Sequence, residues 1–384
     1  MITPPVYLDY QATTPVDERV VSAMEPYWRQ RFGNPHSSTH RFGWEGEAAL
    51  DMARETIAEG LGGVPEGVVF TSGATEANNL ALKGVMQALG HARPHLVTVV
   101  SEHKCVLEAA RHLERDGHEL TLLGVDENGL VDPADLKAAV SERTALVSVM
   151  AVNNEIGVIQ PLKALAAIAH GAGALFHTDA AQAFGKIPLD VADGLDLVSL
   201  SAHKLYGPKG VGALYVRQRP PLKLVPQMDG GGQEGGIRSG TQSPALVAGF
   251  ARAARISLDE RAAETAHIAA LAERLKSRLF AELPGLMLNG HETRRWPGNL
   301  NLSFPGLDGD LLLAELRDLA LSSGAACASA VAGPSYVLKA IGRTEAETRA
   351  ALRIGIGRMT TTEEIDFAAE TLIGAVTSLG GLRP

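Results

Sequence analysis

The chain has 384 residues, of which 45% are hydrophobic and 21% charged, and a formal net charge of −9. This length predicts one large domain and a smaller one, and the acidic balance without a basic cluster argues against nucleic acid as the main partner. The start, MITPPVYLDY, lacks the basic and apolar regions of a secretory signal, and no apolar run is long enough to cross a bilayer. We therefore expect a cytoplasmic protein that does not contact a membrane.

The sequence contains two cysteines, Cys105 and Cys327. Two cysteines cannot build a disulfide framework, and within one chain they cannot ligate zinc or an iron–sulfur cluster. A disulfide between them would be unusual in the cytoplasm. Each is therefore interpreted as a thiol.

Between about residues 45 and 216, short β-rich runs alternate with stretches of helical periodicity. Strands are predicted at VVFT, LVTVV, ALVSVMAV, ALFH, LDLVSL and VGALYV, and helices over 44–60, 75–89, 104–115 and 162–170. This alternation predicts an α/β fold, with a mostly parallel sheet covered by helices on both faces.

The remaining sequence predicts a compact α+β unit. A long amphipathic helix over 243–281 is followed by a strand at NLNLSF, a helix over 309–319, a small-residue loop, a strand at ALRIGI and a final helix. The first fifteen residues are extended and are expected to pack on this unit. We thus divide the chain into a large domain, 16–260, and a small domain, 1–15 with 261–384.

Two polar runs each follow a predicted strand: Asp179 to Gln182 after ALFH, and Ser201 to Lys204 after LDLVSL. In open α/β sheets, ligands bind at the carboxyl ends of the strands. A lysine there can form a Schiff base with an aldehyde and a carboxylate can hold a protonated pyridine nitrogen, which are the two groups that pyridoxal phosphate requires. Alone, Lys204 suits a solvated surface charge and Asp179 a helix cap, but together they favour the cofactor.

The turn from Ser72 to Thr75 joins a predicted strand to a predicted helix. Backbone N–H groups at a helix start bind phosphate, and a threonine hydroxyl adds a donor. A simple capping turn fits the same residues, so the lysine and aspartate decide in favour of phosphate. Ser201 and His203 are expected to complete the phosphate site.

Three further polar residues follow predicted strands or the aspartate. His103 can stack on a flat pyridine ring and shuttle protons near neutral pH, although an ordinary polar strand end is the alternative. Asn154 can hydrogen-bond the ring oxygen or a substrate, or can form a turn with Asn153. Gln182, one helical turn past Asp179, can reach the ring hydroxyl.

The segment SSGAACASAVAGPSYVL surrounds Cys327 almost entirely with serine, glycine and alanine. Such a run predicts a flexible loop at about 322–334 that is poorly ordered without a partner, whereas Gly324 and Gly333 disfavour an alanine-rich helix. A mobile thiol near this cofactor indicates a nucleophile that travels. Cys105, at a helix start, is interpreted as a structural residue facing the sheet.

Two basic residues and a glycine-rich segment remain. Arg353, in ALRIGIGRM, suits the carboxylate of an amino acid, with a surface salt bridge as the alternative. The segment GGGQEGGIRSGT contains Arg238 and Thr241, and a loop this rich in glycine is usually ordered by a ligand or a second subunit.

The ordered set of motifs resembles the cysteine desulfurases, pyridoxal phosphate enzymes of the class-V aminotransferase type. The resemblance covers essentially the whole chain, from YLDYQATTPVD and FGNPHSSTHRFG through FTSGATEANN, SEHK, VNNEIGVIQP, HTDAAQAFGKIP, SAHKLYGPKGVGALYVR and IRSGT to SSGAACAS and LRIGIGRMTTTEEID. It implies the pyridoxal phosphate fold type I, with a mostly parallel seven-stranded sheet in the large domain. The Cys327 loop resembles the longer version found in members that serve iron–sulfur assembly.

The resemblance also implies how the cofactor is held. Lys204 would form the Schiff base, Asp179 would pair with the ring nitrogen, and Gln182 would contact the ring hydroxyl. His103 would stack on the ring and move protons. The phosphate would be held by the residues Ala74 (through its backbone), Thr75, Ser201, His203 and, from the partner subunit of a homodimer, Thr241.

By the same resemblance, Asn154 and Arg353 would bind the substrate carboxylate and Cys327 would take the sulfur. The implied reaction converts L-cysteine to L-alanine and leaves a persulfide, which the loop delivers to an acceptor such as an iron–sulfur scaffold protein. No metal site is expected, apart from Cys327 as a transient cluster ligand during transfer. A selenocysteine lyase, a C–S lyase that releases sulfide, and a non-catalytic pyridoxal phosphate protein are the alternatives.

Two departures from the family pattern concern anchoring and partners. Gly235 stands where the family commonly has arginine, which puts the anchoring of the glycine-rich segment in doubt. The sequence ends at GGLRP, before the extension with which well-known members dock a scaffold protein. The identity of the acceptor therefore stays open.

Overall fold

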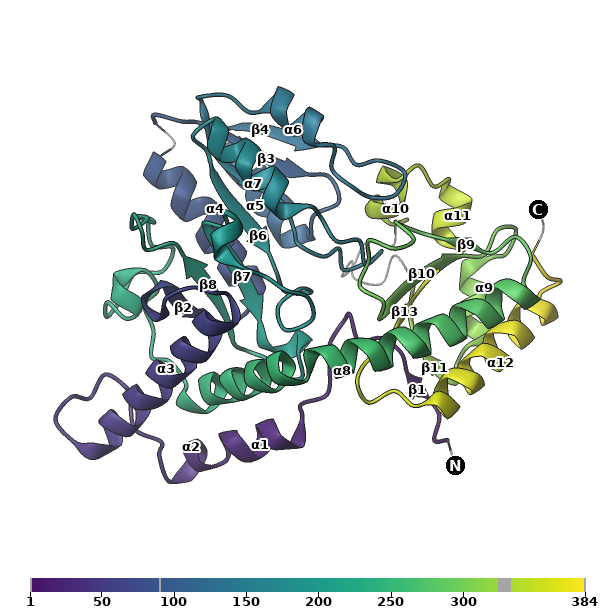
Figure 1. The fold of residues 1–384 in the computed structure, drawn as a ribbon, viewed down its shortest axis with the longest axis horizontal. Helices are drawn as coiled ribbons and strands as arrows, with labels where there is room; N and C mark the ends of the chain where they lie inside the picture. Colours follow the sequence, from purple (N-terminus) through teal and green to yellow (C-terminus); the bar gives the residue numbers. More distant parts are fainter. Residues whose placement is uncertain (1, 90, 324–332, 383–384) are drawn as a thin grey trace.

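A seven-stranded sheet forms the centre of the computed structural model, which describes residues 2–89, 91–323 and 333–382 (Figure 1). Pairing along the sheet is parallel from β4 through β3, β5 and β6 to β7, whereas β8 runs antiparallel to both β7 and β2. The predicted α/β fold with a mostly parallel sheet is thus confirmed. In sheet order the strands are β2 (Val68–Thr71), β8 (Gly212–Val216), β7 (Leu197–Ser201), β6 (Leu175–Asp179), β5 (Thr144–Ser148), β3 (His95–Val99) and β4 (Glu119–Leu123).

Both faces of this sheet are covered, because successive side chains of a strand point to opposite sides. Leu96, Leu146 and Leu197 pack with α4 (Ala74–Leu89) and α5 (Lys104–Arg115) in one apolar core. Their neighbours Val97, Val147 and Val198 pack in a second core. The helices that contribute to this second core include α3 (Arg41–Gly60), α6 (Pro133–Ala139) and α7 (Leu162–Gly171).

A smaller antiparallel sheet lies beside the large one, in the order β12 (Ser322–Ser323), β13 (Ala351–Gly355), β10 (Asn299–Ser303) and β9 (Met287–Leu288). The N-terminal strand β1 (Val6–Tyr7) pairs in parallel with β11 (Leu319–Ala320), so the start of the chain contacts this unit, whereas the assignment of residues 1–15 to the small domain stays a prediction. The helices of this part are α9 (Gly309–Glu315), α10 (Tyr336–Ala340), α11 (Glu345–Arg349) and α12 (Thr362–Ser378).

The helix α8 (Pro244–Glu282) connects the two sheets without interruption over 39 residues. Figure 1 shows it running from below the seven-stranded sheet to the smaller sheet, where it lies beside α12. At its first half it also packs against α1 (Glu18–Met24), α2 (Pro26–Arg29) and α3. The domain boundary at residue 260 falls inside this helix and stays a prediction.

Local differences from the sequence-based expectation have simple causes. The edge strand β4 was missed because its side chains are mostly half-buried or exposed, and α6 was missed because it is only seven residues long. The strand expected at ALVSVMAV ends at Ser148, and the helix expected over 309–319 ends at Glu315 before the chain enters β11.

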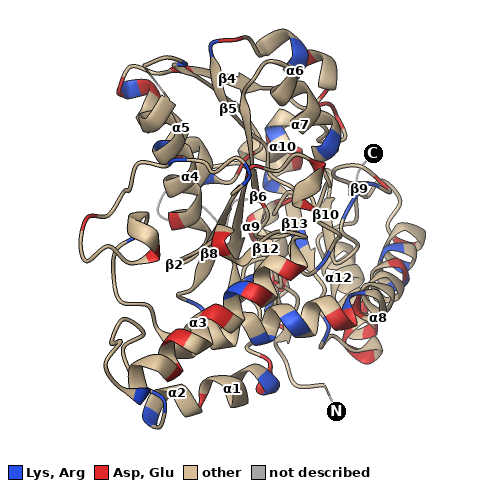
Figure 2. Ribbon diagram, turned by 60° about the vertical axis from the view of Figure 1, so that its left-hand side comes forward, with Lys and Arg blue, Asp and Glu red and all other residues tan. Residues whose placement is uncertain are grey.

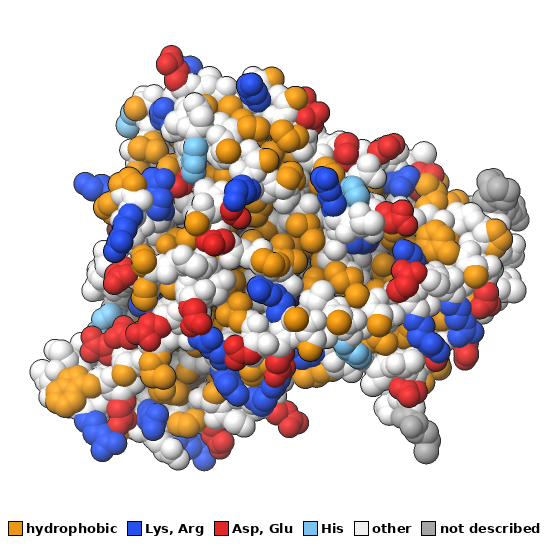
Figure 3. Space-filling view, viewed as in Figure 1, with side chains coloured by type: hydrophobic (Ala, Val, Ile, Leu, Met, Phe, Trp, Pro, Cys, Tyr) orange, Lys and Arg blue, Asp and Glu red, His pale blue; other side chains and the backbone are white. Residues whose placement is uncertain are grey.

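The surface carries charges of both signs. Figure 2 shows acidic and basic residues along the outer helices α3 and α8, and Figure 3 shows charged side chains interspersed with apolar ones over one face. Among the residues that the structure describes, no helix is both long and apolar enough to cross a membrane.

The first residue of β8 must be glycine for the sheet to meet the turn between β2 and α4. A Cβ atom on Gly212 would lie 2.4 Å from the Leu200 carbonyl oxygen and 2.7 Å from the Cα atom of Gly73. Both neighbours are backbone atoms, so neither can move aside without displacing its strand or turn.

We therefore expect Gly212→Ala to lower the free energy of unfolding by about 1–3 kcal/mol, because it overpacks this junction. Urea denaturation followed by circular dichroism measures the change. The matched control is Gly374→Ala on the exposed side of α12, where an added Cβ meets no atom of the described chain within 4 Å. That substitution should stabilise the protein by roughly 0.5–1 kcal/mol, and equal effects of the two variants would contradict the argument.

Candidate active site

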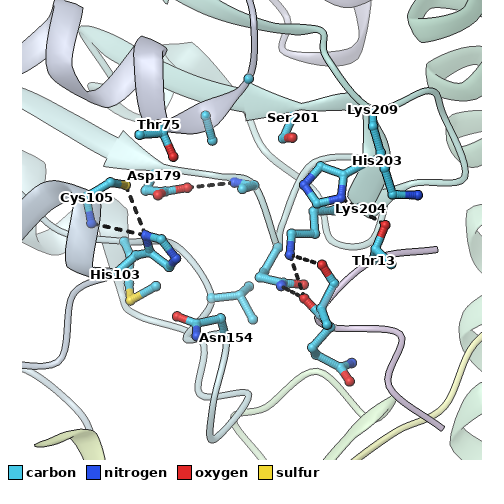
Figure 4. Close-up of a pocket in the computed structure, with 18 of the residues that line it drawn as sticks. Thr13, Thr75, His103, Cys105, Asn154, Asp179, Ser201, His203, Lys204 and Lys209 are labelled. Carbon is cyan, nitrogen blue, oxygen red and sulfur yellow. Dashed lines mark hydrogen bonds between the residues drawn. The ribbon is translucent and has the colours of Figure 1, made fainter. Parts of the chain in front are cut away.

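A cavity of about 570 Å³ opens where β5, β6 and β7 end and α4 begins. This volume lies in the range of small-molecule sites, and the location is the ligand-binding edge of an open α/β sheet. Figure 4 shows side chains from these separate elements pointing into the same space. The predicted site residues on its wall are Ala74, Thr75, His103, Asn154, Asp179, Gln182, Ser201, His203, Lys204 and Arg353.

Two predicted residues are not placed on this wall. Thr241 is exposed and is not among the residues that line the cavity. Cys327, with the expectation of a poorly ordered loop around it, lies outside the described residues.

The carboxylate of Asp179 is fixed at the end of β6. The side-chain amide of Asn78 donates a hydrogen bond to Oδ2 (2.7 Å), and the backbone N–H of Ala181 donates to Oδ1 (2.9 Å). The residue is 5% exposed. A carboxylate held by two donors at the end of a strand has a fixed position, as a partner for a protonated pyridine nitrogen requires.

Lys204 ends the short helix η3 (Ala202–Lys204), which directly follows β7. Its Nζ donates hydrogen bonds to the backbone carbonyls of Gln11 (2.7 Å) and Ala12 (2.6 Å). The Nε2 group of Gln182 also donates to the Gln11 carbonyl (2.8 Å), so its contact with a ring hydroxyl stays a prediction.

The N-terminal segment around Gln11 is part of the site, which the sequence did not reveal. Thr13 Oγ1 lies 3.1 Å from His203 Nδ1, and both the N–H and the hydroxyl of Thr14 donate to the His203 carbonyl. The only signal was a run of polar residues, QATT, within an extended stretch. Such a run does not indicate which distant strand end it will meet.

The part of the cavity that is predicted to bind phosphate is electropositive. Burial lowers the pKa of His203 to about 4, and the positive charges of Lys204, Lys209 and Lys186 add to this effect. The field that disfavours a second proton on this imidazole favours an anion at the same place. The N-terminus of α4, with exposed Thr75 in its first turn, supplies further donors to an anion.

Cys105 packs against the apolar core between the sheet and the helices α4 and α5, as its interpretation as a structural residue expects, and it also lies on the cavity wall. Its Sγ is 3.0 Å from His103 Nδ1 and accepts a hydrogen bond from Asn78 Nδ2 at 3.1 Å (Figure 4 shows the contact with His103). His103 is the N-cap of α5, and its side chain turns toward the residue two positions later. The predicted helix over 104–115 has the same bounds as α5, but the contact between the imidazole and the thiol could not be predicted from the sequence.

Arg353 reaches the cavity from the smaller sheet and is 2% exposed, which rules out the surface salt bridge. Its Nη2 contacts Asp9 Oδ1 (2.8 Å) and Ser322 Oγ (3.1 Å), and its Nη1 donates to the Asn154 carbonyl (3.1 Å). Asn154 Oδ1 is buried on the same wall and has no hydrogen-bond partner in the described part of the chain. A buried oxygen that lacks a hydrogen-bond donor fits a site in which a polar ligand supplies that donor.

Both ends of the segment that contains Cys327 are tied to residues beside the cavity. On one side, β12 pairs with β13, and Ser322 stands opposite Arg353. On the other side, the Ser335 hydroxyl donates to the carboxylate of Glu155, and the Tyr336 hydroxyl donates to the Glu102 carbonyl (2.7 Å). The described residues on both sides of this segment thus contact residues that line the cavity or are next in sequence to them.

The glycine-rich segment is anchored through Glu234, which answers the doubt raised by Gly235. The buried carboxylate of Glu234 accepts hydrogen bonds from the guanidinium of Arg54 (2.7 and 2.8 Å), from the Phe70 N–H (2.9 Å) and from Gln242. Arg238 forms an ion pair with Glu76 (2.6 Å), in the first turn of α4. The segment is therefore held without an arginine at position 235.

Comparison with known proteins identifies the family of this chain. The model of the family described as aminotransferase class-V matches residues 6–367. The chain belongs to the class-V aminotransferase family. It is also 49% identical over 384 residues to the cysteine desulfurase IscS of Rickettsia rickettsii, covering all of this chain and 94% of the relative.

Solved structures with a similar fold agree with this family assignment. A NifS-like protein superposes with a TM-score of 0.91 at 35% identity, covering 98% of this chain and 100% of the other. The structure of SspA in complex with cysteine gives a TM-score of 0.83 at 36% identity, with 94% and 100% covered. The resemblance to cysteine desulfurases, the fold type and the pyridoxal phosphate cofactor predicted from the sequence are therefore confirmed.

The residues present fit pyridoxal phosphate. The cavity places a lysine amine, a buried carboxylate fixed by two donors, and the positive end of a helix around one space. The unpartnered Oδ1 of Asn154 leaves one further polar atom for the cofactor or its substrate. The role of each residue stays a prediction.

The buried carboxyl of Glu155 makes stability depend on pH. Burial raises its pKa from 4.5 to about 7, although the Ser335 hydroxyl and the charge of Arg353 oppose the rise. The unfolded chain therefore loses this proton at a lower pH than the folded chain, so this group makes the protein less stable as pH rises from about 4.5 to 7. A pKa shift of this size corresponds to a loss of about 3 kcal/mol in the free energy of unfolding once the pH is well above the pKa of the folded state.

We expect Glu155→Gln to remove that pH dependence, so that its stability relative to the wild type increases between pH 5 and 8. Urea denaturation at several pH values measures the difference. Glu127→Gln, at an exposed position, is the matched control and should leave the pH dependence unchanged. If the free energy of unfolding of the wild type rises between pH 5 and 8 and that of Glu155→Gln rises equally, the prediction is contradicted.

Proposed function

We propose that this chain is a cysteine desulfurase that converts L-cysteine to L-alanine and takes the sulfur on Cys327 as a persulfide, for delivery to iron–sulfur cluster assembly. The observation that carries the proposal is the convergence of Lys204, Asp179 and Arg353 on one cavity. Support also comes from the relative named cysteine desulfurase IscS and from the similar structure of SspA in complex with cysteine.

The cofactor, when bound, supplies an electron sink for the electron pair left at the substrate Cα. Lys204 would hold it covalently through Nζ, and Asp179 would keep its ring nitrogen protonated. Ser201, His203 and the start of α4 at Thr75 would bind its phosphate, in the electropositive part of the cavity.

The substrate is oriented from the opposite wall. The Arg353 guanidinium would pair with the substrate carboxylate while Asp9 and Ser322 keep its plane fixed, and Asn154 would add a hydrogen bond. A charge-assisted pair of this kind sets both position and direction. His103 and Lys204 would then move the protons at the substrate carbons.

Cys327 would act as a thiolate on the sulfur of the substrate. The S–S bond forms as the Cβ–S bond breaks, the electron pair passes to carbon, and protonation there gives L-alanine. Three residues lie between Ser323 and Cys327 in the sequence, and the four Cα-to-Cα steps that join them span at most about 14 Å. By this sequence distance, Cys327 would be within reach of the cavity wall at Arg353.

The partners and the compartment are part of the proposal. Thr241 is exposed, as a residue that completes the phosphate site of a second subunit would be, and we propose a homodimer. The acceptor would be a sulfur-accepting protein such as an iron–sulfur scaffold. A reactive thiol that must cycle through a persulfide suits the reducing cytoplasm.

The test uses purified wild type and Cys327→Ala, with the absorbance spectrum recorded before alanine formation from L-cysteine is measured with and without a reductant. We expect the cofactor band in both proteins, and a loss of alanine formation in the variant on the order of 100-fold or more, because the sulfur acceptor is missing.

Cys327→Ser is the conservative control and should also be inactive, because a hydroxyl is a poor acceptor of sulfur. If either variant still forms alanine and releases sulfide, the C–S lyase or selenocysteine lyase alternative replaces the proposal. A protein that binds no pyridoxal phosphate would overturn the role of Lys204, and Lys204→Ala should lose the absorbance band.

A further inference from the structure

The tautomer of His103 is constrained by the helix that it caps. His103 is the N-cap of α5, and its Nδ1 accepts a hydrogen bond from the backbone N–H of Cys105 at 3.2 Å. A backbone N–H can only donate, so Nδ1 must present its lone pair. In the neutral imidazole the proton is then on Nε2.

The thiol of Cys105 makes a second contact with the same nitrogen. Its Sγ lies 3.0 Å from His103 Nδ1 and accepts a hydrogen bond from Asn78 Nδ2 at 3.1 Å. Burial raises the pKa of this thiol to about 12, with a further rise from the charge of Asp179. Near neutral pH the thiol therefore keeps its proton, and the S–H group shares the single lone pair of Nδ1 with the Cys105 N–H, while Asn78 Nδ2 donates to the sulfur.

These contacts form one chain of hydrogen bonds from His103 through Cys105 and Asn78 to Asp179. The chain joins the imidazole on the wall to the carboxylate at the end of β6. Coupled hydrogen bonds of this kind fix orientation more firmly than isolated ones. Figure 4 shows the ring of His103 with one nitrogen toward Cys105 and the other toward the open cavity.

We propose that Cys105 is a positioning residue: its thiol and its backbone N–H together hold neutral His103 in the tautomer that carries its proton on Nε2, the nitrogen facing the cavity. This inference deepens the proposed function and rests on it for its role in catalysis. His103 thus presents an N–H group to whatever reacts in the cavity. Cys105 itself does not accept sulfur, because a thiol with its pKa near 12 is thiolate only to about one part in ten thousand at pH 8.

Several charges act on His103 besides this chain. Burial lowers its pKa most strongly, Asp179 on β6 raises it, and Lys204 on η3 and Lys104 on α5 lower it further. The adjacent carboxyl of Glu102 is buried, and burial raises its pKa well above the usual range, which favours the neutral acid. None of these groups changes when residue 105 is substituted, so a shift in the pKa of His103 reports the loss of the thiol.

The experiment is nitrogen-15 NMR of protein labelled at histidine, with and without pyridoxal phosphate, and with His103→Gln to assign the signal. We expect the proton on Nε2 in the wild type at pH 8. In Cys105→Ala the pKa of His103 should rise by about half to one unit, because a donor to the neutral ring is lost. Cys105→Ser keeps a donor and should restore the wild-type value.

The pH dependence of kcat/KM is a second measurement, and it must agree with the pKa obtained by NMR. The acid limb of kcat/KM for L-cysteine should move to higher pH in Cys105→Ala by the same amount, and return in Cys105→Ser, while the cofactor absorbance and the circular dichroism of both variants match the wild type. A proton on Nδ1 in the wild type, or equal pKa values of His103 in the wild type and Cys105→Ala, would overturn the inference. An Nε2 proton in a protein without desulfurase activity would overturn the proposed function and leave the tautomer assignment standing.

Discussion

The parallel pairing of β5, β6 and β7 is the constraint on which the site depends. Parallel strands end on the same side of a sheet, so the chain must deliver Asn154, Asp179 and Lys204 to one edge although they are far apart in sequence. The cores on both faces fix this pairing, since a shift of one residue would exchange the two sets of buried side chains. The positions of these three side chains are therefore a consequence of core packing rather than of contacts among themselves.

The remaining wall of the cavity comes from parts of the chain that are not in the seven-stranded sheet. The N-terminal segment supplies the carbonyls that accept from Lys204, and β13 supplies Arg353. Both are held to each other, because the Gly355 N–H donates to the Leu8 carbonyl and Asp9 pairs with Arg353. The wall that carries Arg353 is thus built on a unit that joins the N-terminal segment to β13.

The sequence predicted those features that depend on local pattern. The strand ends that carry Asp179, Lys204 and His103 follow from the alternation of strands and helices. The involvement of Gln11 and Thr13 could not be predicted, because an extended polar run carries no information about its distant partner. The contact between Cys105 and His103 could not be predicted for a different reason: it depends on the side-chain cap at the first turn of α5. Arg353 was identified by its chemistry alone, since the packing of the smaller sheet against the cavity is a tertiary property.

The uninterrupted helix α8 also limits how the molecule can move. Its 39 residues span about 58 Å, and it packs against α3 under the large sheet and against α12 under the small one. A rotation of one sheet relative to the other would have to bend this rod and break its backbone hydrogen bonds. Because it packs on both parts of the molecule, α8 couples the sheet that carries Asp179 to the sheet that carries Arg353.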